Sequence, residues 1–139
     1  MEVREVTAAE SADLRRRVLR GGRDVPLPGD EEPSHHVGVY DEGRLVATGN
    51  IRKEPSFHLS ETWWRIRGMA TEPDHRGRGA GRLVLDALLE HARTNGGGGV
   101  WCNARLPAVA FYERAGFVTD GAEWTDPEIG PHVRMWVGL

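Results

Sequence analysis

Arginines and glycines alternate in the segment HRGRGAGR, residues 75–82, directly ahead of an amphipathic run. Glycines allow a ligand to approach the backbone and permit turns in which successive N–H groups point to one side. A helix that follows such a turn adds unpaired N–H groups and the positive end of its dipole. Together with the charges of Arg76, Arg78 and Arg82, this pattern predicts a binding site for a phosphate or pyrophosphate group.

The spacing excludes two common phosphate-binding motifs. A P-loop needs GxxxxGK[ST], but this segment contains no lysine, and Lys53 is the only lysine of the chain. A dinucleotide fingerprint needs GxGxxG, whereas Gly77, Gly79 and Gly81 are spaced GxGxG. The remaining alternative is a turn that only starts a helix, and the three arginines favour the phosphate site over it.

Other conspicuous residues have simpler interpretations. Cys102 has no histidine near it in the sequence, so we expect it to pack as a small apolar side chain rather than to act as a nucleophile. His35 and His36 are adjacent and would point to opposite faces of a strand, and no HExxH or CxxC motif is present, so no metal site is expected. The acidic residues 30–33 are interpreted as a solvated loop. The tryptophans are expected to pack in the core, with an aromatic acceptor pocket as the alternative.

The elements that must position these residues follow from alternation, helical periodicity and turn residues. Before the glycine-rich segment, the sequence predicts a strand over 2–6, a helix over 8–20, a loop over 21–34 with or without a helical turn, a hairpin of strands near 36–40 and 44–52, a loop over 53–61 and a strand over 62–71. After it, the sequence predicts a helix ending at 95–96, a strand over 100–104, a helix within 106–116, and closing strands over 117–124 and 132–139.

Two of these helices have specific sequence signals. Thr7 and Glu10 have the spacing of a capping box ahead of the first helix. After the glycine-rich segment, apolar residues recur on one helical face from Val84 to Ala92, and Asn95 with Gly96 matches the preferences of a helix end.

Length and composition limit the class of protein. The 139 residues match one domain, predicted to span 1–139, with a mixed α/β sheet and helices packed on it. The formal net charge of -3 gives no indication of a nucleic-acid partner. No apolar run reaches the roughly 18 residues of a membrane span, and the N-terminus has no apolar signal core, so a cytoplasmic location is expected. A single cysteine excludes an intrachain disulfide.

Two segments together resemble a known family. R-x-x-G-x-G, carried by Arg76, Gly79 and Gly81 between a strand and a helix, resembles the coenzyme A motif of the GCN5-related N-acetyltransferases (GNAT). AVAFYERAGF, residues 108–117, is similar to a second signature of that family, a helix that carries a tyrosine and ends in Gly-Phe. The resemblance covers residues 62–118. It implies a GNAT fold, a mostly antiparallel sheet of about six or seven strands flanked by about four helices.

The resemblance also implies where acetyl-CoA binds. Backbone amides of the glycine-rich segment hold the pyrophosphate in the family, which carries over to Arg76, Gly77, Arg78, Gly79, Ala80, Gly81 and Arg82. The preceding strand holds the pantetheine arm, which carries over to Met69, Ala70 and Thr71, and a bulge at Gly68 or Met69 would free an N–H for the thioester carbonyl. Phe111 is a further expected cofactor contact, and Asn103 is expected to take the place of a family asparagine two positions later, with hydrogen bonds to local backbone groups as its alternative role. Many members have an asparagine where this chain has Arg105.

The reaction implied is acetyl transfer from acetyl-CoA to a primary amine by direct attack. Tyr112 carries over as the general acid that protonates the departing thiolate, with core packing as its alternative role. His132 is the expected contact to the acceptor, and Glu54, His58 and Glu61 are the other ionisable groups considered as a base, with a water relay as the alternative. The acceptor is a small-molecule or protein amine of open identity.

A second hypothesis is a non-catalytic acyl-CoA-binding or regulatory module on the same fold. It is motivated by Arg105 and by the absence of an evident base, and Tyr112 argues against it. Membrane and nucleic-acid partners are not expected, and pairing of two copies through an exposed sheet edge stays open.

Overall fold

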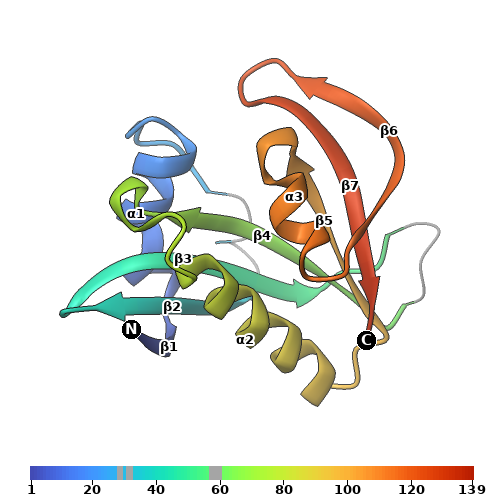
Figure 1. The fold of residues 1–139 in the computed structure, drawn as a ribbon, viewed down its shortest axis with the longest axis horizontal. Helices are drawn as coiled ribbons and strands as arrows, with labels where there is room; N and C mark the ends of the chain where they lie inside the picture. Colours follow the sequence, from blue (N-terminus) through green and yellow to red (C-terminus); the bar gives the residue numbers. More distant parts are fainter. Residues whose placement is uncertain (28–29, 31–32, 57–60) are drawn as a thin grey trace.

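A computed structural model describes residues 1–27, 30, 33–56 and 61–139 of the chain. Seven strands form one sheet in the order β1-β2-β3-β4-β5-β7-β6, and every neighbouring pair is antiparallel except β4 and β5 (Figure 1). The strands are β1 (Glu2–Val6), β2 (His35–Asp41), β3 (Arg44–Lys53), β4 (Trp63–Thr71), β5 (Gly99–Arg105), β6 (Val118–Asp126) and β7 (Gly130–Gly138).

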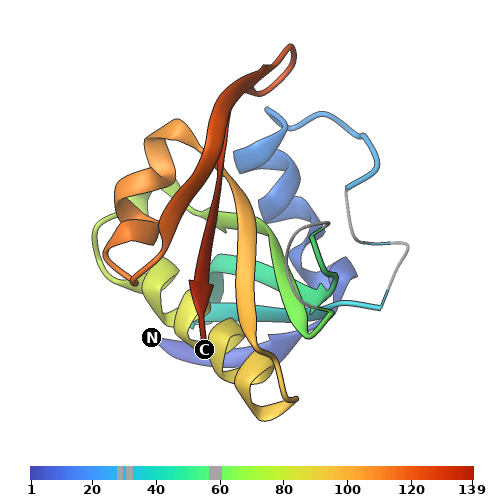
Figure 2. The same ribbon diagram turned by 90° about the vertical axis from the view of Figure 1, so that its right-hand side faces the viewer.

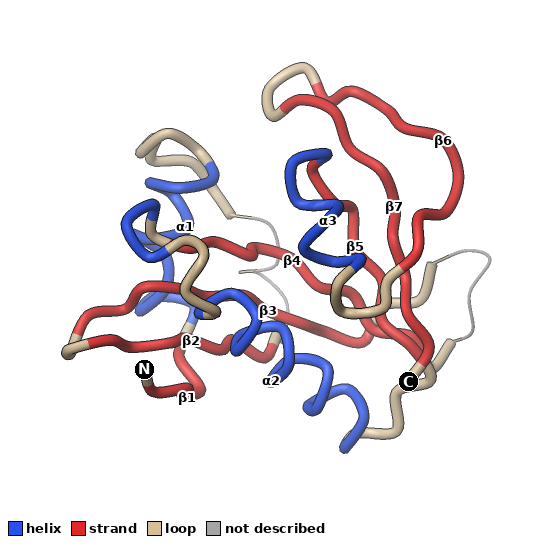
Figure 3. Tube along the Cα trace, viewed as in Figure 1, coloured by secondary structure: helices blue, strands red, loops and turns tan. Residues whose placement is uncertain are grey.

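Helices cover both faces of this sheet. The helices are α1 (Ala8–Leu19), α2 (Ala80–Thr94) and α3 (Val109–Glu113), and short 3-10 turns span Pro73–His75 and Leu106–Ala108. Figure 2 shows α1 on one side of the central strands and α2 with α3 on the other. Figure 3 traces the same alternation of helices and strands along the chain. The strand pattern confirms the predicted α/β class and the mostly antiparallel sheet.

The number of helices is lower than expected. Three α-helices are present among the described residues, against about four predicted. Residues 21–27, 30, 33 and 34 are in no helix, because glycine and proline in this segment interrupt the backbone hydrogen bonds that a helix needs. The predicted helix within 106–116 is also shorter, since it begins with a 3-10 turn and its α-helical part spans only Val109–Glu113.

The first helix begins as the sequence predicts. The backbone N–H of Glu10 donates to Thr7 Oγ1 at 3.0 Å, and the N–H of Thr7 donates to Glu10 Oε1 at 3.0 Å. This reciprocal pair satisfies donors that a helix start leaves unpaired, and it confirms the capping box.

The main core lies between the sheet and the faces of α2 and α3. Its fully buried members include Val84, Leu85, Leu88 and Ala92 of α2, with Val39, Val46, Ile51, Val100 and Met135 from the strands. The predicted apolar face of α2 is therefore the buried one. Because side chains alternate along a strand, the intervening residues of β3 and β4 face the opposite side, where α1 packs.

Candidate functional site

A cleft opens where β4 and β5 separate. The two strands pair in parallel only from Trp63 opposite Gly99 to Arg65 opposite Trp101. Beyond this point the edge of β4 that faces β5 has no strand partner among the described residues, so its backbone N–H and C=O groups are available to a ligand. The cleft has a volume of about 320 Å³, within the lower range of small-molecule sites.

A bulge in β4 lies at the point of separation. The register between β3 and β4 shifts so that Gly49 faces both Gly68 and Met69, while Thr48 pairs with Ala70 on one side of the shift. Gly68 has a φ of +66°, a conformation that glycine adopts without strain. Such a bulge turns backbone groups away from the ladder. The predicted irregularity at Gly68 and Met69 is thus present, and both residues line the cleft.

The glycine-rich segment forms an open turn at the start of α2. Gly77 and Gly79 have φ of +77° and +86°, and a β-carbon at either would meet no atom within 4 Å. Gly79 is the N-cap of α2 and supplies no side-chain hydrogen bond to the first turn, which also lacks an acidic residue. Arg76 and Arg78 are exposed and have no ion-pair partner in the described part of the chain. These features fit an anionic group at the turn.

Ion pairs hold this turn to the β2–β3 hairpin. Asp74 accepts hydrogen bonds from Arg44 at 2.8 Å and from the ring of His75 at 2.8 Å, and His75 Nε2 lies 2.9 Å from Asp41 Oδ2. The hydrogen bonds from His75 and Arg44 lower the pKa of Asp74 to about 2, and those with Asp74 and Asp41 raise the pKa of His75. The start of the glycine-rich turn is therefore fixed to the sheet by charge as well as by packing.

Tyr112 lies at the base of the cleft, where α3 packs against β5. Its ring is 95% buried and contacts the rings of Phe111 and Phe117, each at a centroid distance of 5.2 Å. Burial raises the pKa of the Tyr112 phenol well above its ordinary value, and the neighbouring Cys102 thiol adds to this effect. Burial likewise raises the pKa of Cys102 to about 12. Tyr112 therefore keeps its proton at neutral pH, as a proton donor must.

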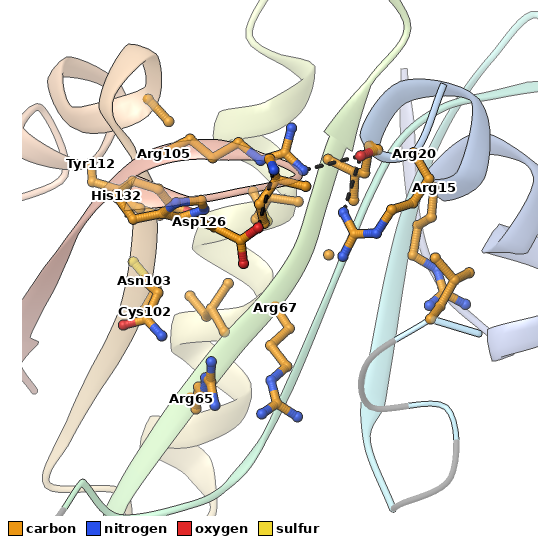
Figure 4. Close-up of a pocket in the computed structure, with 18 of the residues that line it drawn as sticks. Arg15, Arg20, Arg65, Arg67, Cys102, Asn103, Arg105, Tyr112, Asp126 and His132 are labelled. Atoms are coloured by element: carbon orange, nitrogen blue, oxygen red, sulfur yellow. Dashed lines mark hydrogen bonds between the residues drawn. The ribbon is translucent and has the colours of Figure 1, made fainter. Parts of the chain in front are cut away.

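Arginines dominate the α1 side of the cleft (Figure 4). Arg65 and Arg67 extend from β4, and Glu54 contacts both, at 2.9 Å from Arg65 Nη1 and 3.7 Å from Arg67 Nη2. Glu54 also pairs with Arg52. Burial opposes ionisation of Glu54, but the hydrogen bonds from Arg65 and Arg52 outweigh it, and the pKa of this carboxyl lies below its ordinary value. This makes Glu54 a weak base, which does not fit the deprotonation of an amine.

Arg105 turns toward α1. Its Nη2 donates to the carbonyl oxygen of Leu19, the last residue of α1, at 3.1 Å. Burial and the neighbouring Arg20 lower the pKa of Arg105, and Asp126 partly offsets this. The side chain at this position thus belongs to the α1 side of the cleft and not to the α2 side, where the glycine-rich turn lies.

His132 lines the cleft from β7. It is 95% buried, stacks on Trp124 at a centroid distance of 5.6 Å, and its Nδ1 lies 2.8 Å from the carbonyl oxygen of Gly130. A carbonyl oxygen only accepts, so Nδ1 carries a proton and the lone pair of neutral His132 is on Nε2. Trp124 also lines the cleft, whereas Trp63 and Trp136 pack on each other at 5.4 Å.

The predicted site residues fall into two groups. Met69, Asn103, Tyr112 and His132 line the cleft, and residues 76–82 form the open turn beside it. Phe111 is outside the cleft lining, and its ring packs under Gly81, where a β-carbon would lie 3.4 Å from Cε1. His58 is outside the described residues, and Glu61 is exposed. No cluster of residues suited to a metal ion occurs in the described ranges.

The arginines of β4 were not predicted as part of the site. Arg65 and Arg67 are two residues apart, so in a strand they point to the same face. Charged residues at alternate positions of an otherwise apolar central strand indicate that one face of the strand borders a partner or a ligand, since a buried charge needs one of these. Sequence alone gave no means to see that this face borders the cleft.

Comparisons with known proteins agree with this arrangement. Residues 6–117 match the family model of the Acetyltransferase (GNAT) family. The uncharacterized N-acetyltransferase YitI of Bacillus subtilis strain 168 is 28% identical over 144 residues, covering 100% of this chain and 97% of that protein. A GCN5-related N-acetyltransferase from Kribbella flavida superposes with a TM-score of 0.74 at 18% identity, covering 99% of this chain and 97% of that one. A ribosomal-protein-alanine N-acetyltransferase from Brucella melitensis gives 0.74 at 16%, covering 100% of both chains. At these identities the two solved structures show the shared fold alone.

Proposed function

The chain belongs to the acetyltransferase (GNAT) family and is an N-acetyltransferase that uses acetyl-CoA, and from this premise we propose how its residues divide the work. The separation of β4 from β5 beside the open glycine turn is the observation that carries the proposal. No described helix is long and apolar enough to cross a membrane.

We assign cofactor binding to the turn and to the free edge of β4. Backbone amides of residues 77–82, with Arg76 and Arg78, would hold the pyrophosphate, because these groups have no competing partner among the described residues. Met69, Ala70 and Thr71 would pair with the pantetheine arm through their backbone, in place of the strand partner that β5 does not provide. Asn103 lies across the cleft from them, on β5.

Bound acetyl-CoA supplies an acetyl thioester, whose carbonyl carbon an amine nitrogen can attack directly with departure of the thiolate. The chain's own groups then have three tasks. The cleft orients the amine, which removes much of the entropic cost of the encounter. A backbone N–H of Gly68 or Met69 donates to the carbonyl oxygen as negative charge develops there. Tyr112 donates its phenolic proton to the sulfur as the C–S bond breaks.

His132 completes the proposed site on the acceptor side. Its Nε2 lone pair is free to accept a hydrogen bond from the attacking amine, because Nδ1 is engaged by the carbonyl oxygen of Gly130. Among the described residues that line the cleft, Asp126 is the other base without an ion pair. Its Oδ1 accepts hydrogen bonds from the backbone N–H groups of Glu128 and Ile129.

Calorimetric titration of acetyl-CoA tests the cofactor assignment. Binding by the wild type should weaken at least tenfold in the Arg76→Ala/Arg78→Ala variant, because two charge-assisted contacts to phosphate are lost. Arg93, exposed and paired with Glu90 at 2.7 Å, provides the control, and Arg93→Ala should bind as the wild type does. Absence of binding by folded wild-type protein would overturn the proposal.

A further inference from the structure

The α1 side of the cleft carries an excess of positive charge. Within the described ranges, Asp126 is the one carboxylate among the residues that line the cleft. The arginines that line it are Arg15, Arg20, Arg65, Arg67 and Arg105. They come from α1 and the residue that follows it, from β4 and from β5, and Figure 4 shows Arg20 and Arg105 at one end of the cleft and Arg65 and Arg67 at the other.

Carboxylates outside the lining neutralise this charge only in part. Asp30 pairs with Arg15 at 2.7 Å. Glu54 contacts Arg65, Arg67 and Arg52, so one carboxylate is shared among these guanidinium groups. The Nε of Arg65 is buried and has no hydrogen-bond partner among the described residues. An unpaired buried donor of this kind costs free energy unless a ligand satisfies it.

Arg20, Arg67 and Arg105 are the cleft arginines with the weakest compensation, and of these Arg67 and Arg105 extend from the two strands that separate. Arg67 approaches Glu54 only to 3.7 Å and lies directly before the bulge. Arg105 has no described ion pair and donates to a backbone carbonyl oxygen. Each has a second arginine as a neighbour, Arg65 beside Arg67 and Arg20 beside Arg105, and burial together with this repulsion lowers the pKa of both. They lie on the two strands that separate, one on each side of the opening.

We infer that the acceptor is an amine that also carries a carboxylate, of the size of an amino acid, and that one of two arginines, Arg67 at one end of the cleft or Arg105 at the other, binds this carboxylate. The inference rests on the proposed acetyl transfer and adds the substrate class. Guanidinium groups bind carboxylates through paired hydrogen bonds, and burial strengthens such contacts. A cleft of about 320 Å³ accommodates a small molecule of this kind. Polyamines and aminoglycosides would instead place their extra positive charges against the arginines.

Three uncharged or singly charged analogues of an acetylated product test this without turnover. N-acetylglycine is anionic, N-acetylglycinamide is its neutral counterpart, and N-acetylethylenediamine is the cationic one, all of similar size. Each is titrated by calorimetry into protein saturated with coenzyme A. We expect N-acetylglycine to bind at least tenfold more tightly than the amide, and the cation to bind least. Equal affinities, a preference for the cation, or no binding of any analogue would overturn the inference.

Variants assign the preference to one of the two arginines. In either Arg67→Gln or Arg105→Gln, N-acetylglycine should bind no more tightly than the amide does, and lysine at the same position should restore part of the preference because it keeps the charge but not the paired hydrogen bonds of the guanidinium group. Arg93→Gln removes one charge from the exposed face of α2 and should leave the preference unchanged. A preference that persists in both glutamine variants would overturn the assignment.

Titration of acetyl-CoA into the same proteins separates the two proposals. Protein that binds acetyl-CoA but shows no carboxylate preference would contradict the acceptor class alone. Protein that fails to bind acetyl-CoA would contradict the proposed function itself. Because the arginines lie on the α1 side and the glycine turn on the α2 side, acetyl-CoA affinity should be retained in the Arg67 variants.

Discussion

The surroundings of Tyr112 keep its phenol protonated for the proposed proton transfer. Its ring is held by Phe111 and Phe117, and its hydroxyl has the Cys102 thiol as a polar neighbour. Both groups have raised pKa values, so neither ionises in the free protein near neutral pH. A neutral phenol retains the proton that a departing thiolate must receive, which is the first requirement of a general acid.

Replacing Tyr112 by phenylalanine should therefore slow catalysis without preventing binding. We expect the turnover rate to fall by about 10²–10⁴-fold, the usual contribution of general acid catalysis, with acetyl-CoA affinity unchanged. Single-turnover release of coenzyme A measures the first quantity and calorimetry the second. Tyr40→Phe, in β2 and away from the cleft, is the control. Full turnover in Tyr112→Phe would remove Tyr112 from the assigned role.

At the level of residues, sequence reasoning was strongest where a motif fixes the backbone. The positive φ of Gly77 and Gly79 is what the alternating glycines predicted. Arg67 and Arg105, the proposed acceptor contacts, were not identified from the sequence, because their significance depends on which face of a strand borders the cleft. That information comes from the packing of α1 and is not local in sequence.

Among the elements, the bulge in β4 connects the sheet to the chemistry. A β-carbon at Gly68 would lie 2.8 Å from Asn50 Nδ2 and 3.2 Å from Arg15 Cδ. Glycine is therefore required at this position for two reasons: its φ of +66°, and the close approach of β3 and α1.

Gly68→Ala should lower both stability and activity. The positive φ alone costs about 1–2 kcal/mol for an alanine, and crowding against Asn50 adds to this cost and displaces the bulge. Gly121 has a φ of +83° with no atom within 4 Å of a β-carbon, so Gly121→Ala carries the conformational cost without the crowding. Urea unfolding and acetyl transfer should show the larger loss in Gly68→Ala. Equal losses in the two variants would contradict a specific role for the bulge.

The types and positions of the helices and strands were predicted better than the point at which two strands separate. The capping box of α1 and the apolar face of α2 follow from short-range patterns, and the structure confirms both. The point at which β4 leaves β5 depends on three neighbouring strands, and no local pattern specifies it. The lower helix count has a local origin, since glycine and proline keep the described part of residues 21–34 out of a helix.

For the molecule as a whole, net charge conceals a strong asymmetry. The formal charge is -3, yet arginines converge on one face of the central strands. Glu54 compensates part of their charge, and hydrogen bonds from Arg65 and Arg52 stabilise its ionised form. The sequence total could not reveal this, because it averages over both faces of the sheet. The single-domain organisation over 1–139 stays a prediction.

The Glu54 cluster should make stability depend on pH in acid. The pKa of Glu54 in the folded protein lies below the ordinary value of 4.5, so its contribution is fully present above pH 4.5 and is lost as the pH falls through the folded pKa. Asp74, lowered to about 2, acts in the same direction but is exposed and screened. Urea unfolding between pH 7 and pH 3 should show a decline that begins near pH 4.5.

Two glutamine variants isolate this contribution. Glu54→Gln should be less stable at pH 7 and should show a shallower decline in acid, whereas the exposed Glu123→Gln should follow the wild type. A Glu54→Gln profile parallel to that of the wild type would contradict the cluster as the source.

The short contact between β4 and β5 has a consequence beyond catalysis. Three residue pairs join the backbone ladder of β1–β4 to that of β5–β7, so this seam is the weakest line of backbone hydrogen bonds in the sheet, and the shared hydrophobic core holds the two halves together. With the pantetheine arm in the proposed place, the cofactor acts as a staple across that seam, and local opening becomes coupled to its concentration. We therefore expect resistance to proteolysis to rise with the concentration of acetyl-CoA, so that the metabolite which the protein consumes also protects it.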